Sequence, residues 1–405
     1  MTTVDPSPVR RTRRLVGAAV LVLLGGAVTS GATVVTAEAG LPAGVLTGVV
    51  AGPSAEAADC SRFRPADQVY FNDPRLDGDN DVQDVMECRI GQTPGGQTIR
   101  VATTNLDDPT LAQALIDADQ RGVHVRVAVD RGRCDTGPAN ALRRQLGRTS
   151  GDRSKFRCVT KSGRTDSGVM HQKSLTITRT GGVSNVVLVG SANMTQEAYR
   201  DQWNDTFQYV RRPTIHRWYV TVFEQILADG ATATPYREYT DGPARAQFLP
   251  TNSNTAAADP VLARIDGLDR GNLVRIAMYN WPRTDRGIWL RDAIIRQKRA
   301  GVRFRIAVGP AVNEGIVSEL RGAGISVQKV YDDGCKAGHV EKTCNYTHTK
   351  FMTLRFTLGG RTEYRTWTGS DNFVDLLSAE NIQRIGGRRI HDRYVAFFRR
   401  MVGAY

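Results

Sequence analysis

Residues 170–175 read MHQKSL and residues 347–352 read THTKFM, so a His-x-Lys run occurs twice in this chain. Each run is followed by a stretch of alternating apolar and polar residues. A second short motif then follows, GSAN at residues 190–193 and GSDN at residues 369–372. The two histidines lie 177 residues apart and the two serines 179 residues apart. This agreement indicates a duplicated unit in which each half supplies one reacting group.

The duplication extends over most of the chain. RVATTN at residues 100–105 is matched by RIAMYN at 275–280, and IHRWYVTVF at 215–223 is matched by IHDRYVAFF at 390–398. In both halves a strand, a helix and a second strand follow one another, which is the order of a parallel pair joined by a crossover. A period this long indicates two fused domains and not a solenoid. We expect an α/β fold with two mixed-sheet sandwich domains related by a pseudo-twofold axis.

Composition divides the chain into segments. An arginine-rich start precedes an uncharged apolar run at residues 15–28, and an Ala-x-Ala pattern follows at residues 55–57. This order predicts an export signal, and the apolar run is shorter than a membrane-spanning helix requires. We therefore expect a secreted, extracellular protein. The expected segments are a signal peptide at 1–58, an N-terminal domain at 59–230, a linker rich in Gly, Ala, Thr and Pro at 231–246, and a C-terminal domain at 247–405.

Six cysteines follow the predicted signal, and none forms a C-x-x-C pair. In an exported protein this favours disulfides over a zinc site. We favour sequential pairing, in which each bridge closes a loop within one half: Cys60–Cys88, Cys134–Cys158 and Cys335–Cys344.

The chain of 405 residues carries a formal net charge of +13. Such a surplus favours anionic partners, which include phosphate esters, nucleic acid and an anionic membrane surface. An arginine-rich proteome would produce the same surplus without any functional meaning.

Strand periodicity places the His and the Lys of each run on the same face. Each predicted strand reaches a Gly-Gly pair, at residues 181–182 and 359–360, and the returning strand ends at Gly-Ser-x-Asn. A hairpin of this kind returns the Asn to the neighbourhood of the His and the Lys.

These paired motifs resemble the signature of the phospholipase D superfamily, His-x-Lys-x4-Asp followed by Gly-Ser/Gly-x-Asn. The resemblance spans residues 60–405 and implies two phospholipase D-like domains that share one active-site cleft. The chain departs from the signature at the Asp, where Thr178 and Arg355 stand.

The resemblance implies that His171 attacks phosphorus and that His348 protonates the leaving alkoxide and then activates water. Chemistry supports two histidines, because a phosphodiester needs a nucleophile and an acid on opposite sides of phosphorus. Lysines offset the phosphate charge and asparagines donate to its oxygens. The candidate catalytic residues are His171, Lys173, Asn193, Asp205, His348, Lys350, Asn372 and Glu380, with Ser191 and Ser370 as candidate substrate-binding residues.

Asp205 and Glu380 enter this set as acids that orient the histidines, because DTFQYV at residues 205–210 aligns with ENIQRI at 380–385. No metal-ligand spacing is present, so we expect no metal and no other cofactor. The other histidines have simpler interpretations: His216 and His391 as structural residues of amphipathic helices, and His124 and His339 as surface residues.

The favoured function is a secreted, metal-independent phospholipase D that hydrolyses phosphatidylcholine-type lipids to phosphatidic acid and a free head group. Its substrate would lie in a phospholipid membrane surface, and transfer to another alcohol is chemically equivalent to hydrolysis. The alternative is a secreted endonuclease of the same superfamily that acts on nucleic acid. A third interpretation is an inactive binding module. Because both motifs occur in one chain, we expect a monomer.

Overall fold

The computed structural model describes residues 59–76, 80–147, 153–335 and 344–405. All described residues belong to one compact unit, Glu56–Tyr405. The predicted signal peptide and His339 lie outside the described residues.

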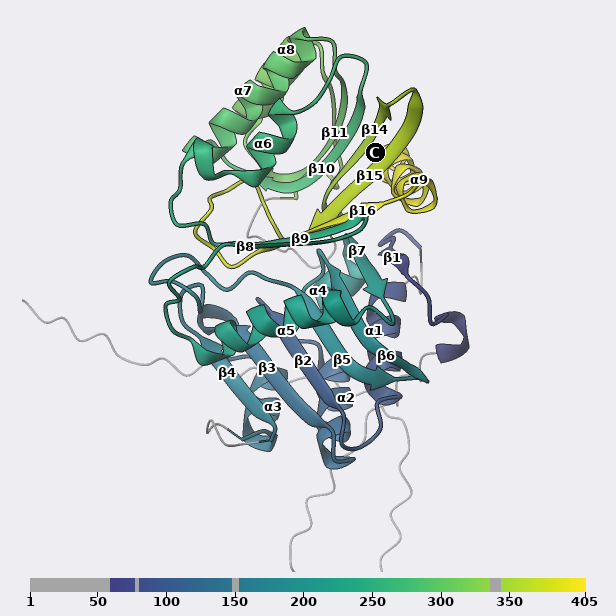
Figure 1. The fold of residues 1–405 in the computed structure, drawn as a ribbon, viewed down its shortest axis with the longest axis vertical. Coiled ribbons are helices and arrows are strands. Elements are labelled where there is room, and N and C mark those ends of the chain that lie inside the picture. The colour runs from purple at the N-terminus through teal and green to yellow at the C-terminus, as the bar shows by residue number, and fades with distance from the viewer. Residues whose placement is uncertain (1–58, 77–79, 148–152, 336–343) are drawn as a thin grey trace, which may run out of the picture. The chain divides into compact units, whose positions relative to one another are not determined.

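The N-terminal half contains one mixed sheet with the strand order β1-β7-β6-β5-β2-β3-β4 (Figure 1). Strands β2, β3 and β4 are parallel, and the other neighbours on this path are antiparallel. The strands are β1 (Gln68–Asn72), β2 (Thr98–Thr103), β3 (His124–Asp130), β4 (Lys155–Val159), β5 (Ser174–Thr180), β6 (Val183–Gly190) and β7 (Gln202–Tyr209). The helices are η1 (Cys60–Arg62), α1 (Asp81–Gly91), α2 (Pro109–Gln120), η2 (Arg131–Arg133), α3 (Gly137–Gln145), α4 (Gln196–Arg200) and α5 (Pro213–Ala228).

The C-terminal half repeats this plan with the order β12-β11-β10-β14-β15-β16-β9-β8. Its strands are β8 (Arg237–Asp241), β9 (Ala244–Phe248), β10 (Leu273–Trp281), β11 (Arg303–Val312), β12 (Ser326–Lys329), β13 (Tyr346–Thr347), β14 (Lys350–Leu358), β15 (Arg361–Gly369) and β16 (Asn381–Gly386). Its helices are η3 (Ala256–Ala258), α6 (Pro260–Asp266), α7 (Asp285–Arg299), α8 (Glu314–Gly322) and α9 (Arg388–Gly403). Strand β13 leaves its own half and pairs with β7 of the first sheet.

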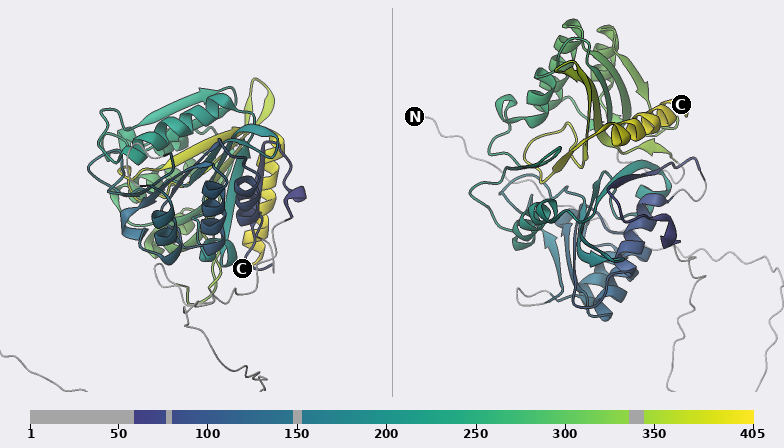
Figure 2. Two further views of the ribbon diagram at one scale, coloured as in Figure 1. Left: turned by 90° about the horizontal axis from the view of Figure 1, so that it is seen from below. Right: turned by 45° about the vertical axis from the view of Figure 1, so that its right-hand side comes forward.

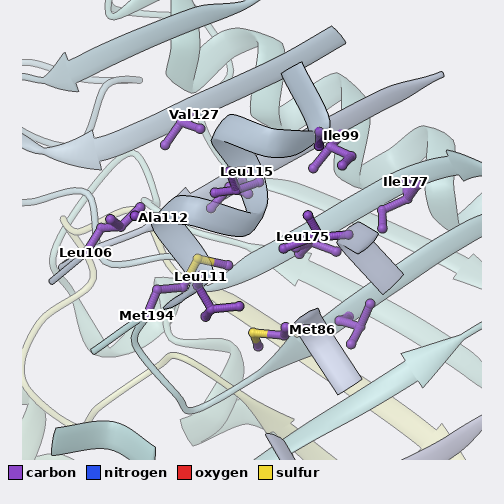
Figure 3. Packing of buried hydrophobic residues seen from close by; sticks show 14 of the residues in the cluster. Met86, Ile99, Leu106, Leu111, Ala112, Leu115, Val127, Leu175, Ile177 and Met194 are labelled. Carbon is purple, nitrogen blue, oxygen red and sulfur yellow. The ribbon is translucent and has the colours of Figure 1, made fainter. Parts of the chain in front are cut away.

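Helix α2 shows how local sequence and core packing agree. Asp108 accepts a hydrogen bond from the backbone N–H of Leu111, and Pro109 begins the helix, as N-cap and N1 residues commonly do. Leu111 and Leu115 are fully buried and lie close to Leu175 of β5 (Figure 3). Burying a leucine side chain contributes about 1.5–3 kcal/mol, so this apolar face fixes the helix on the sheet.

The last helix of each half joins the two halves. Helices α5 and α9 belong to one hydrophobic cluster that also contains residues of both sheets. Trp218 of α5 stacks on Tyr239 of β8 at 5.3 Å, and Phe397 of α9 stacks on Phe71 of β1 at 4.0 Å. Each helix therefore packs on its own sheet and on an edge strand of the other half (Figure 2).

The duplicated α/β architecture is confirmed. The three predicted disulfides are present, Cys60–Cys88, Cys134–Cys158 and Cys335–Cys344. The predicted linker at 231–246 needs correction, since β8 and the start of β9 lie within it and form a hairpin of the second sheet. The Gly242-Pro243 turn that suggested a linker is the turn of this hairpin. No helix among the described residues is both long enough and apolar enough to cross a membrane.

Candidate active site

Both histidines lie just before a central strand and are held by the opposite half. His171 precedes β5 and donates its backbone N–H to the carbonyl oxygen of Ala379 at 3.0 Å. His348 precedes β14 and donates its N–H to the carbonyl oxygen of Trp203, also at 3.0 Å. This reciprocal exchange brings the two His-x-Lys segments to one site.

The imidazole of His171 contacts the carboxylate of Glu380, with 2.7 Å between Nδ1 and Oε1. Both side chains are largely buried, at 18% and 6% exposure. An ionised carboxylate only accepts hydrogen bonds, so Nδ1 carries the proton and Nε2 keeps its lone pair. Glu380 therefore orients a histidine, as the sequence predicted.

The imidazole of His348 contacts an amide instead of a carboxylate. Its Nδ1 lies 3.3 Å from Oδ1 of Asn204. The Nδ2 group of Asn204 donates to the carbonyl oxygen of Ala198 at 2.9 Å and to Oε1 of Gln202 at 3.0 Å, which fixes the amide with its oxygen toward His348. An amide oxygen only accepts hydrogen bonds, so His348 also carries a proton on Nδ1.

The prediction for Asp205 is wrong by one residue. The N–H of Ser191 bonds to the carbonyl oxygen of Asp205, and the N–H of Ser370 bonds to that of Asn381, so Asn204 and Glu380 are the equivalent positions. Successive strand residues face opposite sides. The carboxylate of Asp205 therefore points away from His348 and accepts hydrogen bonds from the hydroxyls of Thr368 and Tyr394.

The two motif serines bind protein groups and not a ligand. Both side chains are fully buried. The Oγ of Ser191 donates to Oδ1 of Asn204 at 2.8 Å, and that of Ser370 donates to Oδ1 of Asn381 at 3.1 Å. Their predicted substrate-binding role is therefore not supported, and each serine instead ties the end of one strand to the next.

The two lysines lie in the site with 3% and 4% of their surface exposed. Lys173 Nζ donates to Thr104 Oγ1 and to the carbonyl oxygen of His171, both at 2.9 Å. Lys350 Nζ makes the equivalent bond to the carbonyl oxygen of His348. Each ammonium group is thus held beside the histidine of its own motif.

The two motif asparagines keep unused hydrogen-bonding capacity. Among the described residues, no protein group bonds to the amide oxygen of Asn193 or of Asn372, and both atoms are buried. A buried polar group without a partner is costly, so these side chains are kept for a ligand or for water.

A family model described as "Cardiolipin synthase, PLD-like domain" matches residues 88–227, which include the first His-x-Lys and Gly-Ser-x-Asn motifs. The second half repeats this unit with its own motifs and its own sheet. Residues 88–227 therefore form a phospholipase D-like domain. This similarity supports an enzyme of the phosphodiesterase type.

Solved structures agree with this phospholipase D-like fold. Phosphatidylserine synthase from Haemophilus influenzae Rd KW20 is 13% identical, with a TM-score of 0.53 over 83% of this chain and 86% of the synthase. Polyphosphate kinase from Porphyromonas gingivalis is 16% identical, with a TM-score of 0.51 over 82% of this chain. The match spans about half of the kinase, 49% of its length. No curated protein sequence matches the chain.

Burial and neighbouring charge perturb every ionisable group of this phospholipase D-like site. Burial, with the two lysines, holds the pKa of His171 and of His348 well below the usual range, so both imidazoles are neutral at rest. Burial lowers the pKa of Lys173 to about 7 and raises that of Glu380 to about 7. Because each lysine acts on both imidazoles, the two motifs form one electrostatic unit.

Sequence reasoning missed a buried arginine that supports the second Asn. Arg286 is fully buried and bonds to the carboxylates of Asp259 and Asp371 and to the carbonyl oxygens of Asn372 and Asp375. Asp371 lies inside the Gly-Ser-Asp-Asn motif, and its charge was the feature of the sequence that could have indicated a basic partner. Arg286 thus fixes the backbone that presents Asn372.

A second missed contact lies against His348. Tyr279 sits at a register shift in β10, with its ring centroid 4.5 Å from that of His348. Lys350 Nζ lies 5.0 Å from the centre of the same ring. The ring of Tyr279 therefore packs against both His348 and Lys350 of the second motif.

Thr178 occupies the position of the missing motif Asp in the first half. Its hydroxyl donates to Oε1 of Gln97 at 2.9 Å and accepts the N–H of Thr98 at 3.0 Å. It therefore links two strands at a distance from the histidines. Among the described residues, no three His, Cys, Asp or Glu side chains are placed to share a metal ion.

Proposed function

We propose that this protein is a phospholipase D that hydrolyses phosphatidylcholine-type lipids to phosphatidic acid and free head group. The observation that carries the proposal is the pairing of two Nδ1-protonated histidines, each with a lysine and an asparagine, at one site formed by both halves. The match to a cardiolipin synthase-type domain and the fold shared with a phosphatidylserine synthase support a lipid substrate.

In the first step, the Nε2 lone pair of His171 attacks phosphorus and the bond from phosphorus to the head-group oxygen breaks. His348 enters this step as the imidazolium, because the bound phosphate anion favours uptake of a second proton from solvent at Nε2. It donates this Nε2 proton to the head-group oxygen, so a neutral alcohol leaves and His348 keeps its Nδ1 proton. The new phosphohistidine carries positive charge on its ring, and the carboxylate of Glu380 stabilises this charge through Nδ1. The ammonium groups of Lys173 and Lys350 offset the charge of the phosphoryl oxygens.

In the second step, His348 accepts a proton from water as the water oxygen attacks phosphorus. The bond from phosphorus to Nε2 of His171 breaks, phosphatidic acid leaves, and both imidazoles return to their starting states. An alcohol in place of water would give transfer by the same route. No step uses a metal ion.

We also propose that the protein is exported, acts as a monomer and binds its substrate at a phospholipid membrane surface. The arginine-rich start with its apolar run and the three disulfides support export. N-terminal sequencing of protein recovered from the culture medium tests this. A chain that stays in the cells with an intact Met1 would contradict it.

The second candidate is an endonuclease, because a net charge of +13 favours a polyanionic substrate. The deciding experiment measures choline release from phosphatidylcholine vesicles beside cleavage of plasmid DNA, both in chelator. His171→Ala should abolish whichever of the two activities the protein has. The matched control is His124→Ala, because His124 lies on a strand remote from the site. Choline release lost only in His171→Ala supports the lipase. DNA cleavage alone, lost in the same variant, supports the nuclease, and neither activity supports a binding module.

A further inference from the structure

Four arginines gather on the face of the second sheet that α9 covers. Arg275 of β10 is the direct partner of Arg305 on β11. Arg355 of β14 lies opposite Leu273, two residues from Arg275 and on the same face. Helix α9 packs on β10 and β14 (Figure 1). Its Arg399 lies within electrostatic range of Arg275. We call these four residues the arginine cluster.

The N-terminal half has two arginines at the equivalent place in the fold, but there a carboxylate balances their charge. Its equivalents of Arg275 and Arg305 are Arg100 and Arg126. Glu224 of α5 lies 2.8 Å from Nε of Arg100 and 2.9 Å from a terminal nitrogen of Arg126. One carboxylate therefore neutralises this pair in the N-terminal half.

The second half reverses this balance. Counting from the start of the 16-residue helices α5 and α9, Arg399 stands where Glu224 stands. Arg355 stands where the first half has Thr178. Two substitutions thus replace an internal counter-charge by two further positive charges. Like charges close together repel one another, and an anion bound among them would relieve this repulsion.

No such anion comes from the protein. Among the described residues, no carboxylate lies within ion-pair distance of any member of the arginine cluster. Arg275 is only 5% exposed, and its Nε is buried without a hydrogen bond. The neighbouring His391 also has a buried and unpartnered Nε2. Asp392, beside it on α9, is engaged by Arg388 and by Nδ1 of His391.

We propose that the arginine cluster is a second anion site that binds a phosphate group. Guanidinium groups match phosphate oxygens through paired N–H donors, which suits a compact group better than a lysine patch would. Arg305, Arg355 and Arg399 are exposed and lie around the buried Arg275, so the cluster is compact, which favours a single phosphate over a nucleic-acid backbone.

This site is distinct from the active site. Arg355 lies five residues beyond Lys350 on β14, so the two side chains face opposite sides of the sheet and are separated by roughly 16 Å along the strand. A phosphate group on this face could belong to a lipid head group or to a free phosphate. The binding does not depend on the proposed hydrolysis.

The test is calorimetric titration of the full chain with inorganic pyrophosphate at constant ionic strength. Wild type should show two binding events, one at each site. Arg399→Glu restores the carboxylate of the first half and should weaken one event roughly tenfold or more, as loss of a charged contact predicts. Lys173→Gln should weaken the other. Arg299→Glu, an equal charge change on the exposed surface of α7, is the matched control and should keep both.

Two events retained in Arg399→Glu and in a second variant, Arg305→Gln, would overturn the proposal. A single wild-type event that Lys173→Gln removes would also overturn it, as would binding of an oligonucleotide but not of pyrophosphate. Sedimentation with phosphatidylcholine vesicles, with and without phosphatidic acid, separates the two sources. If the phosphate belongs to a lipid, Arg399→Glu should lose the sedimentation that depends on phosphatidic acid in the vesicles. If the site takes free phosphate, this variant should lose only the pyrophosphate-binding event.

Discussion

Replacement of Glu380 by Gln tests the electrostatic basis of the site, because it removes one charge and almost no volume. The carboxylate lies 2.7 Å from Nδ1 of His171, and both groups are largely buried. An opposite charge at this range favours the cationic imidazole by about 1–3 pKa units, which is about 1.4–4 kcal/mol. The phosphohistidine ring also carries a positive charge, so the carboxylate stabilises it in the same way. We therefore expect kcat/KM to fall about 10- to 1,000-fold.

The pH profile separates this electrostatic effect from simple misfolding. Burial raises the pKa of Glu380 to about 7, so below that pH the carboxylate is protonated and no longer supports His171. Wild-type kcat/KM should therefore rise through about pH 7, with an apparent pKa that belongs to the Glu380–His171 pair. Glu380→Gln should remain low and lack this rise.

The assay is hydrolysis of a chromogenic phosphodiester, with kcat/KM measured from pH 5 to pH 9. Glu363→Gln removes the same charge from the exposed part of β15 and is the matched control. An unchanged rise near pH 7 in Glu380→Gln, at wild-type activity, would refute the role of the carboxylate.

Three further changes test other parts of the structure. Asn204→Asp places a carboxylate beside His348 and should raise its pKa, so the alkaline limb of kcat/KM moves up by about 1 pH unit or more, and an unmoved limb would argue against this contact. Arg286→Leu leaves two buried carboxylates unpaired and should lower the free energy of unfolding by about 3–5 kcal/mol in urea, whereas a loss below about 1 kcal/mol would contradict the buried network. Replacing Cys134 and Cys158 by Ala opens a loop of 24 residues and should cost about 3 kcal/mol in thermal unfolding, with an unchanged Tm as the contrary result.

Several features were predictable because they depend on local spacing. The paired His-x-Lys and Gly-Ser-x-Asn motifs gave the duplication, the two hairpins and the candidate histidines and lysines. The Gly-Gly pairs at 181–182 and 359–360 are turns with positive φ, as glycine permits. The cysteines paired as predicted because each pair lies within one half.

The partners of the two histidines depend on strand register and on contacts between the halves, which the sequence does not carry. A shift of one residue along a strand reverses its faces, so aligning Asp205 with Glu380 placed the wrong residue beside His348. Arg286 bonds to the carbonyl oxygen of Asn372 only because the tertiary fold brings it together with Asp259 and Asp371, which are far from it in the chain.

The sequence by itself therefore determined which residue types the paired motifs supply to the candidate site: two histidines, two lysines and two asparagines on a duplicated α/β frame. Only the tertiary structure decided that His171 faces a carboxylate and His348 an amide, and that four arginines gather without a counter-charge. The physical reason is that motifs and periodicity act within one segment. Electrostatic environment is instead set by side chains that burial brings together from distant segments.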